Sequence, residues 1–246
     1  MVMLGNRTGA WDFSGAGEML LIDKPLNWTS FRVVQRVRTL FRASKVGHAG
    51  TLDPKATGLL IVCTGKQTKT MNRYVDLDKE YLGTFELGVR TASHDSETEI
   101  LERRDFSGVT LEALRSAAKR FVGSQLQRPP MYSAAKHHGK PLYTYARKGR
   151  TIEKEPREIE VSEFEIASFT PPFVEFRIVC SKGTYVRSLV DDVGSALECG
   201  ATLKNLRRTR IGPYHVEDAY SIESLGALSA EVQPEQEAYE TGVSAG

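Results

Sequence analysis

One aspartate, Asp53, occupies the part of the sequence best suited to chemistry. It follows two glycines, Gly47 and Gly50, which suit a backbone that takes a positive φ or comes close to a ligand. Pro54 disfavours the helical conformation for the residue before it, so we expect Asp53 to be extended on a stiff loop. The apolar run at 59–63 predicts a buried strand that anchors this loop. Such a carboxylate is suited to catalysis, although most Asp-Pro steps are ordinary turns.

An arginine, Arg187, is expected near the start of a helix that begins close to Thr184. The helix is predicted by an apolar stripe made of Val186, Leu189, Val190, Val193 and Leu197. A positive charge in the first turn of a helix is opposed by the helix dipole. We therefore expect another interaction to favour Arg187, and a salt bridge to a fixed carboxylate would do so.

The stretch 128–150 combines positive charge with aromatic side chains. It contains six lysines and arginines, three tyrosines and no acidic residue. Basic side chains pair with phosphates and aromatic rings stack on bases, so this mixture suits RNA. The alternative for the charges alone is an exposed loop followed by a helix.

The elements that position these residues alternate between strands and helices. Strands are predicted at 19–22, 59–63, 80–88, 159–166 and 173–180. A helix with Ser30 as its N-cap is predicted from the apolar residues Phe31, Val34, Val37, Leu40 and Phe41. A second helix, near 111–121, is expected to end at Gly123. This pattern predicts an α+β fold with a mixed, largely antiparallel central sheet flanked by helices.

Composition narrows the class of protein further. The formal charge of +2 over 246 residues hides an acidic end, because residues 231–246 carry four glutamates and no lysine or arginine. Three well-separated cysteines offer neither a zinc site nor a disulfide framework, so we expect buried reduced thiols. No signal peptide or membrane-spanning run is visible, and we expect a cytoplasmic protein. Residues 1–17 are predicted to be a disordered extension, 18–225 the catalytic domain and 226–246 a flexible acidic tail.

The segment GHAGTLDPKATGLLIVCTGKQTK around Asp53 resembles the signature of the tRNA pseudouridine-55 synthases of the TruB type. Further segments resemble the same family in the same order: PPMYSAAKHHGKPLY within 128–150, GTYVRSLVDDVG around Arg187, and LKNLRRTRIG at 203–212. The resemblance runs from about Glu18 to about Tyr220. Most bacterial members continue into a small RNA-binding domain, whereas about two dozen residues follow here, so most of that domain is expected to be missing.

The resemblance implies isomerisation of a uridine at position 55, in the T-loop of tRNA, to pseudouridine after the base is flipped out. It implies that Asp53 is the catalytic carboxylate, that Tyr81 stacks on the target base and that Arg187 pairs with Asp53. The remaining implied substrate or RNA contacts are His48, Lys24, Tyr185, Leu206, Lys136, Arg147, Arg207 and Arg208. Among them His48 would take the vacated place in the RNA stack, with a histidine bonded within its own turn as the alternative. Leu206 would line the catalytic pocket.

No cofactor and no metal are expected, because the reaction involves no redox change and the sequence offers neither a phosphate-binding loop nor a spaced histidine pair. The expected partner is the T-arm stem-loop of tRNA, bound by a monomer with no membrane contact. Three alternatives remain: a pseudouridine synthase acting on another RNA, a non-catalytic RNA-binding or folding chaperone, and a hydrolase using His48 and Asp53. The last would need a nucleophile or a metal nearby, and Thr51 alone is a poor candidate.

Overall fold

The structure, a computed structural model, describes residues 11–232. Within that range a central sheet of nine strands runs through the molecule in the order β1-β3-β12-β4-β11-β10-β7, with β2 paired to β3 and β13 to β12. The strands are β1 (Met19–Lys24), β2 (Val46–Ala49), β3 (Ala56–Thr64), β4 (Lys79–Leu87), β7 (Gly123–Gln127), β10 (Arg157–Thr170), β11 (Phe173–Cys180), β12 (Ala201–Ile211) and β13 (Tyr214–His215). The β3–β12 pair is parallel and the other pairs of this sheet are antiparallel, which confirms the predicted α+β class.

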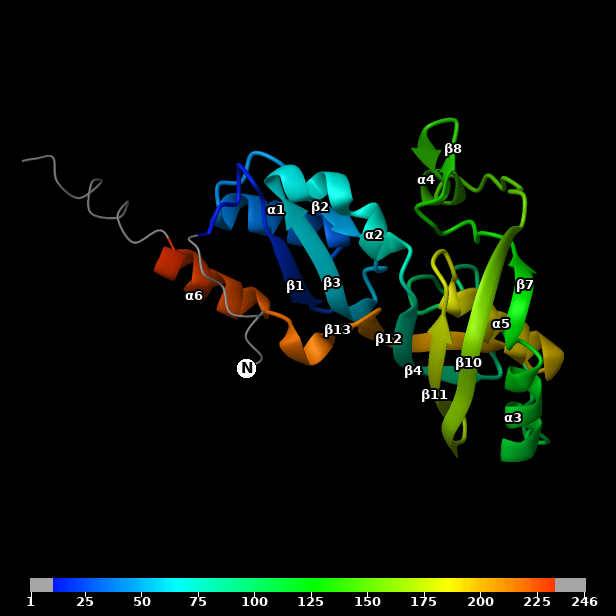
Figure 1. The fold of residues 1–246 in the computed structure, drawn as a ribbon. Coiled ribbons are helices and arrows are strands. Elements are labelled where there is room, and N and C mark those ends of the chain that lie inside the picture. The colour runs from blue at the N-terminus through cyan, green and yellow to red at the C-terminus, as the bar shows by residue number, and fades with distance from the viewer. Residues whose placement is uncertain (1–10, 233–246) are drawn as a thin grey trace, which may run out of the picture.

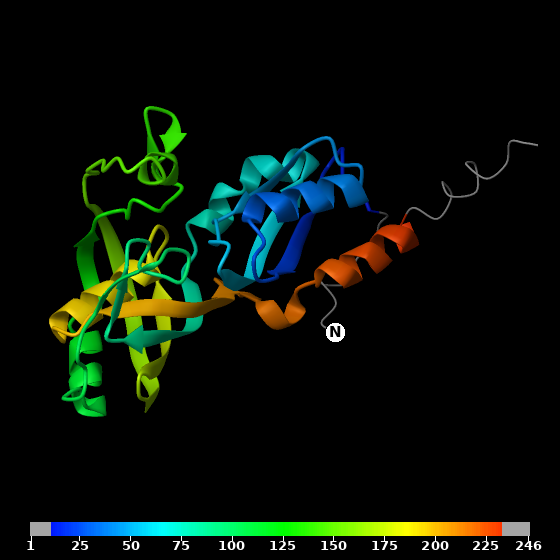
Figure 2. The ribbon, with the colours of Figure 1, turned by 180° about the vertical axis from the view of Figure 1, so that it is seen from behind.

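Helices pack against this sheet. The molecule has two lobes, and β12 runs from one to the other (Figures 1 and 2). The helices are α1 (Ser30–Leu40), α2 (Asn72–Val75), α3 (Leu111–Lys119), α4 (Leu142–Ala146), α5 (Val186–Ala196) and α6 (Ile222–Val232), with short 3-10 turns η1 (Gly65–Thr70) and η2 (Val216–Asp218). The first lobe holds β1–β3 with α1, α2 and α6, and the second holds β4, β7, β10 and β11 with α3 and α5. Two small hairpins, β5 (Val89–Thr91) with β6 (Ile100–Arg103) and β8 (Lys136–His137) with β9 (Lys140–Pro141), complete the described chain.

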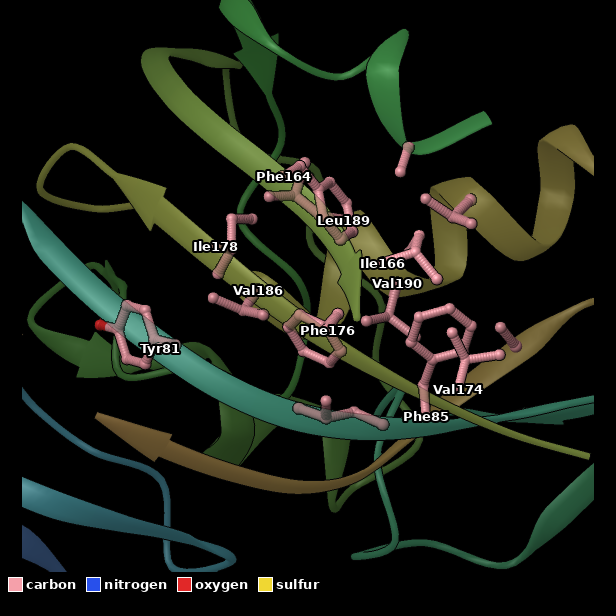
Figure 3. Packing of buried hydrophobic residues seen from close by; sticks show 14 of the residues in the cluster. Tyr81, Phe85, Phe164, Ile166, Val174, Phe176, Ile178, Val186, Leu189 and Val190 are labelled. Atoms are coloured by element: carbon pink, nitrogen blue, oxygen red, sulfur yellow. The ribbon is translucent and has the colours of Figure 1, made fainter. Parts of the chain in front are cut away.

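The second lobe contains the larger hydrophobic core. This core forms because alternate residues of the strands face α3 and α5. Along β4 the residues at 79, 81, 83, 85 and 87 are buried, while those between them are exposed or intermediate. Phe85 lies 5.7 Å from Phe176, and Phe164 lies 5.8 Å from Phe176, measured between ring centroids (Figure 3). The free cysteines are buried, as expected.

Helix α1 differs in detail from its prediction. Thr29, not Ser30, is the N-cap, and its side chain accepts a hydrogen bond from the backbone N–H of Arg32. Ser30 is instead buried, together with Val33, and Phe31 is 62% exposed. The correction follows from helix periodicity: the buried stripe is centred on Val33, Val34 and Val37, and Phe31 lies off it.

Residues 1–17 and 226–246 were predicted to be a disordered extension and a flexible tail. Parts of both segments are ordered within the described residues 11–232. Residues 11–17 form a turn, and Phe13 is buried with its ring 4.0 Å from that of Phe41, so this part is not a disordered extension. At the other end α6 continues past the predicted start of the tail, because Leu225 and Leu228 bury their side chains in the core of the first lobe. The predictions for residues 1–10 and 233–246 lie outside the described residues.

Candidate active site

An open cleft of about 340 Å³ lies where the two lobes meet, and Asp53 is on its wall. Its lining comes from six separate parts of the chain: the loop 50–53 with the first residue of β3, the end of α2, strand β4, residues 134–135, the start of α5 with the turn before it, and strand β12. Segments far apart in sequence thus converge on the predicted catalytic aspartate. No helix within residues 11–232 is long and apolar enough to span a membrane.

Asp53 and Arg187 form the ion pair that the sequence predicted. Arg187 Nε donates to Asp53 Oδ2 at 3.0 Å. The arginine side chain is 3% exposed and the aspartate side chain 41% exposed, so a buried cation holds a carboxylate that remains accessible from the cleft. The guanidinium donates two more hydrogen bonds, to the carbonyl oxygens of Ser93 at 3.2 Å and Tyr132 at 2.6 Å. Three segments therefore fix the orientation of Arg187, and Arg187 fixes that of Asp53.

The start of α5 explains how an arginine is tolerated there. The helix begins at Val186, two residues later than expected, and Tyr185 occupies the N-cap position. Gln127 fastens this end: its Nε2 donates to the Tyr185 carbonyl at 3.1 Å and its Oε1 accepts from the Tyr185 N–H at 2.7 Å. The ring centroid of Tyr185 lies 5.5 Å from the Arg187 guanidinium carbon. These contacts, together with the carboxylate, outweigh the unfavourable helix dipole.

The loop that carries Asp53 is held from behind by Arg208 and Ser30. Arg208, 1% exposed, donates to the carbonyl oxygens of Leu59 at 2.7 Å and Gly50 at 3.0 Å. Ser30 Oγ accepts from the Leu52 N–H at 2.9 Å and donates to the Leu52 carbonyl at 3.1 Å. Gly50 has a φ of +85°, which favours glycine. The loop is thus held by hydrogen bonds from β12 and α1, in addition to the bond from Arg187 of α5.

Tyr81 and Leu206 provide the apolar walls of the cleft. Tyr81 lies at the edge of the second lobe's core, with its hydroxyl directed away from Phe85 and Phe176 (Figure 3). It is 8% exposed, and burial raises the pKa of its phenol. Leu206 lies opposite Gly83 on the neighbouring strand and is partly buried against the same core.

Lys24 and Arg208, which are predicted to contact RNA, are both buried. Lys24 Nζ donates to the carbonyl oxygens of Pro25 at 3.1 Å and Trp28 at 2.7 Å. Burial is the main reason that the pKa of Lys24 is lowered to about 8. The hydrogen bonds of both side chains to backbone carbonyls fix the loops beside Asp53, and Arg208 also lines the cleft.

Tyr185 lines the cleft, whereas His48, Lys136, Arg147 and Arg207 are not among its lining residues. His48 is half-buried on β2, and its Nδ1 has no hydrogen-bond partner among residues 11–232. Burial, followed by the charge of Arg208, lowers the pKa of His48. Arg207 makes two hydrogen bonds to Asp23, at 3.0 and 2.7 Å. Lys136 and Arg147 belong to the segment that projects beyond the second lobe around β8 and α4 (Figure 1).

Two contributors to the site were missed in the sequence. Lys79 is 5% exposed, lines the cleft, and donates to the carbonyls of Val75 and Leu77; burial lowers its pKa to about 8. Its place two residues before Tyr81, on the same face of a strand, was a usable signal. The Ser93 carbonyl left no such signal, because a backbone acceptor carries no residue-type preference.

Solved structures share this architecture. A chain in the crystal structure of a Cbf5–Nop10–Gar1 complex matches with a TM-score of 0.68 and 28% identity over 92% of this chain and 56% of that one. A chain of an H/ACA RNP bound to a substrate RNA matches with a TM-score of 0.65 and 26% identity over 92% and 56% of the two chains. This chain thus spans a little over half of those structural relatives. The fold and the cleft define a protein of the pseudouridine-synthase class.

Sequence comparison gives the family. The model described as TruB family pseudouridylate synthase, N-terminal domain, matches residues 38–186, and the tRNA pseudouridylate synthase B C-terminal domain matches 187–241. The tRNA pseudouridine synthase B of Chlorobium luteolum is 51% identical over 86% of this chain and 75% of its own length. That of Chloroherpeton thalassium is 48% identical over 85% and 89%. The chain belongs to the TruB family of pseudouridylate synthases, as the sequence resemblance indicated.

The boundary between the two family models falls inside α5, between Val186 and Arg187. Asp53 therefore belongs to one family segment and its partner Arg187 to the other. The Asp53–Arg187 pair depends on both segments, since residues 187–211 supply Arg187 and the strand β12 that joins the lobes.

Proposed function

We propose that this protein isomerises the uridine at position 55, in the T-loop of tRNA, to pseudouridine, with Asp53 as the catalytic carboxylate. The observation that carries the proposal is the accessible Asp53 carboxylate held at 3.0 Å by the buried Arg187 on the wall of the cleft. The family membership and the relatives named tRNA pseudouridine synthase B support the choice of reaction and substrate.

The reaction rearranges one nucleotide without losing atoms. The glycosidic bond from C1′ to N1 breaks, the uracil turns, and C5 bonds to C1′; the proton lost from C5 is balanced by one gained at N1. The carboxylate of Asp53 acts as the nucleophile or stabilises the positive charge that develops at C1′. Arg187 keeps that carboxylate in one orientation through the whole sequence of steps.

The target base must leave the RNA stack to enter the cleft. Extrusion costs about a few kcal/mol, and stacking of the base on Tyr81 recovers about 1–3 kcal/mol. Leu206 packs against the base from the β12 side, and His48 occupies the space that the base leaves in the RNA.

The surrounding cationic segment binds the RNA backbone. Residues 134 and 135 line the cleft itself, which connects the 128–150 segment to the reacting base. Lys136 and Arg147 of this segment, with Arg207 on β12, contact phosphates. The protein acts as a monomer in the cytoplasm and needs neither cofactor nor metal.

A second candidate is a pseudouridine synthase that acts on another RNA. It is favoured by the structural likeness to a chain of an H/ACA RNP bound to a substrate RNA. The two candidate functions make different predictions, because a tRNA-specific enzyme modifies an unmodified tRNA transcript without any other RNA or protein.

The test uses purified protein and three RNAs: an unmodified tRNA transcript, the same transcript with cytidine at position 55, and a ribosomal RNA fragment. Pseudouridine is mapped by position after each incubation. The proposal predicts modification of the first RNA at position 55 and of neither other RNA. Modification of the ribosomal fragment alone would favour the second candidate, and no modification of any RNA would contradict both.

A further inference from the structure

The segment 24–45, which contains α1, is the second cationic stretch of the chain. It carries two lysines, four arginines and no acidic residue. The four arginines, Arg32, Arg36, Arg38 and Arg42, are exposed. The exposed face of α3 differs, because Glu112 lies there among the cations Arg115 and Lys119. The charge on α1 is therefore uncompensated within its own element.

An open groove runs beside α1 and has a volume of about 410 Å³. Its lining comprises Trp28, Arg32, Gln35, Arg36, Thr39 and Ile222. The Arg32 guanidinium lies 4.0 Å from the centroid of the Trp28 ring. Neither Arg32 nor Arg36 forms an ion pair with a carboxylate of residues 11–232. A guanidinium held over an indole ring is partly ordered already and loses less side-chain entropy when it binds an anion.

The first turn of α1 is fastened to the loop that carries Asp53. The Asn27 N–H donates to the Pro54 carbonyl at 2.9 Å, and Lys55 Nζ donates to Asn27 Oδ1 at 3.1 Å. Ser30 adds its two bonds to Leu52. The helix then continues away from the catalytic loop for roughly 16 Å, at 1.5 Å per residue. Figure 2 shows α1 on the near side of the strands of the first lobe.

We propose that the arginine face of α1, Arg32 and Arg36 above all, binds the phosphate backbone of the RNA stem that continues from the modified loop. This inference rests on the proposed function. RNA whose target base enters the cleft must leave it across a neighbouring surface, and α1 offers paired cations one helical turn apart beside the catalytic loop. Guanidinium groups bind phosphate through two parallel N–H donors, which suits this role.

A protein partner is the competing occupant of this surface. Arginine and aromatic side chains also occur in protein interfaces, so the feature that favours RNA is the charge: segment 24–45 has six basic residues and no acidic one, which suits a polyanion. Two exposed apolar side chains, Phe31 at 62% and Leu26 at 53%, lie near Trp28 and Arg32 in the chain and are few for a protein interface. Uncompensated arginine beside an aromatic ring is the combination that RNA-binding surfaces use.

The test compares two double variants with the same charge change and the same spacing. Arg32→Glu/Arg36→Glu alters the proposed surface, and Arg115→Glu/Lys119→Glu alters the exposed face of α3, at the far end of the second lobe (Figure 1). The Kd for a T-arm stem-loop RNA is measured by fluorescence anisotropy across a range of salt concentrations. We expect the α1 variant to lower the slope of log K against log salt by about 1.4–1.8, as the loss of two phosphate contacts requires.

The α1 variant is also expected to weaken binding at low salt by about tenfold or more, with the rate of pseudouridine formation at saturating RNA unchanged. The α3 variant should match the wild type in Kd and slope. A neutral variant, Arg32→Gln/Arg36→Gln, repeats the test without reversed charge, and thermal unfolding checks that each variant is folded. An α1 variant whose Kd and slope equal those of the wild type, or an α3 variant equally weakened, overturns the inference. Failure of the wild type to form pseudouridine would instead contradict the proposed function, since RNA binding is measured separately.

Discussion

Arg187 connects more parts of the candidate site than any other single side chain described above. Its guanidinium donates to a side chain and to two backbone carbonyls that come from the catalytic loop, the 91–99 loop and the 128–150 segment. Loss of this residue removes the support of Asp53 and leaves buried carbonyl oxygens without a donor. Its effect should therefore fall on catalysis more than on RNA affinity.

We predict that Arg187→Met lowers the single-turnover rate of pseudouridine formation by at least about 100-fold, a loss of ~2.7 kcal/mol, and changes the Kd for RNA only a few-fold. Arg187→Lys should recover part of the rate, because lysine keeps the charge but lacks the planar fork. Rates and Kd values measured on the same preparations decide the matter. A variant that keeps its rate and loses its affinity would show that Arg187 serves binding instead.

Asp192 gives a prediction about pH and stability. Burial, followed by the neighbouring charge of Asp191, raises the pKa of Asp192 from 3.8 to about 6. The folded protein thus binds this proton more tightly than the unfolded chain. Protonation of Asp192 therefore stabilises the fold fully below about pH 4, and this stabilisation is lost as the pH rises through about 6. Asp192→Asn does not titrate and escapes this loss.

We expect the free energy of unfolding of Asp192→Asn, relative to the wild type, to increase between pH 4 and pH 8 by about 1–3 kcal/mol. Urea unfolding at both pH values measures it, and Asp78→Asn, at an exposed aspartate, is the control. A difference that stays constant with pH would contradict the raised pKa.

At the residue scale the sequence predicted the Asp53–Arg187 pair, because each residue lies in a distinctive family motif. In addition, a positive charge in the first turn of a helix is unfavourable unless a carboxylate pairs with it. It could not predict that Lys24 and Arg208 are buried. The family motifs implied that both residues contact substrate or RNA, whereas their hydrogen-bond partners are carbonyl groups, such as those of Leu59 and Trp28, that any residue type can supply. The sequence does not show that a charged side chain is buried, because only the fold determines where the backbone carbonyls that accept its hydrogen bonds lie.

At the scale of elements, Asp191 of α5 forms an ion pair with Arg90 of β5, whose Nε lies 3.4 Å from the carboxylate. The carboxylate also lies 3.9 Å from His94 Nδ1, but burial lowers the pKa of His94, which favours the neutral imidazole. The Ser93 carbonyl that orients Arg187 lies between Arg90 and His94 in the chain. Asp191 itself is buried. We therefore expect Asp191 to act as a positioning residue for Arg187 through the Arg90 end of this loop.

We predict that Asp191→Asn slows pseudouridine formation at saturating RNA by about threefold to tenfold, the equivalent of losing one charge-assisted contact, and leaves KM within twofold. Asp191→Glu should restore part of the rate by keeping the carboxylate. A change in KM with an unchanged maximal rate would contradict this role, as would equal losses in both variants.

Strands with an apolar run or a clear alternation were easier to predict than helix ends, whereas β2, β7 and β12 were not predicted as strands. Alternation along β4 and the apolar run in β3 identified the strands, since a period of two is a local property. Helix α6 was missed because acidic composition pointed to a tail, while its burial depends on Leu225 and Leu228 meeting the first lobe. Tertiary packing stabilises this helix, and a short window of sequence does not reveal such long-range contacts.

At the scale of the whole molecule, the two cationic stretches lie on different lobes: the 128–150 segment on the second lobe and α1 on the first (Figure 1). We predict that an isolated T-arm stem-loop is modified with a kcat/KM within about tenfold, or ~1.4 kcal/mol, of that for full-length tRNA. Steady-state kinetics on both RNAs test it. A full tRNA preferred by orders of magnitude would place essential contacts outside these two surfaces.

The claim on which the account depends most is that Asp53 performs the chemistry. Its direct test is the single-turnover rate of pseudouridine formation by Asp53→Asn, with the Kd for the same RNA measured on the same preparation. Asparagine is nearly isosteric and keeps an acceptor for Arg187 but provides no carboxylate. The account predicts no detectable pseudouridine and a Kd within a few-fold of the wild type. Pseudouridine formed at a substantial fraction of the wild-type rate would contradict it.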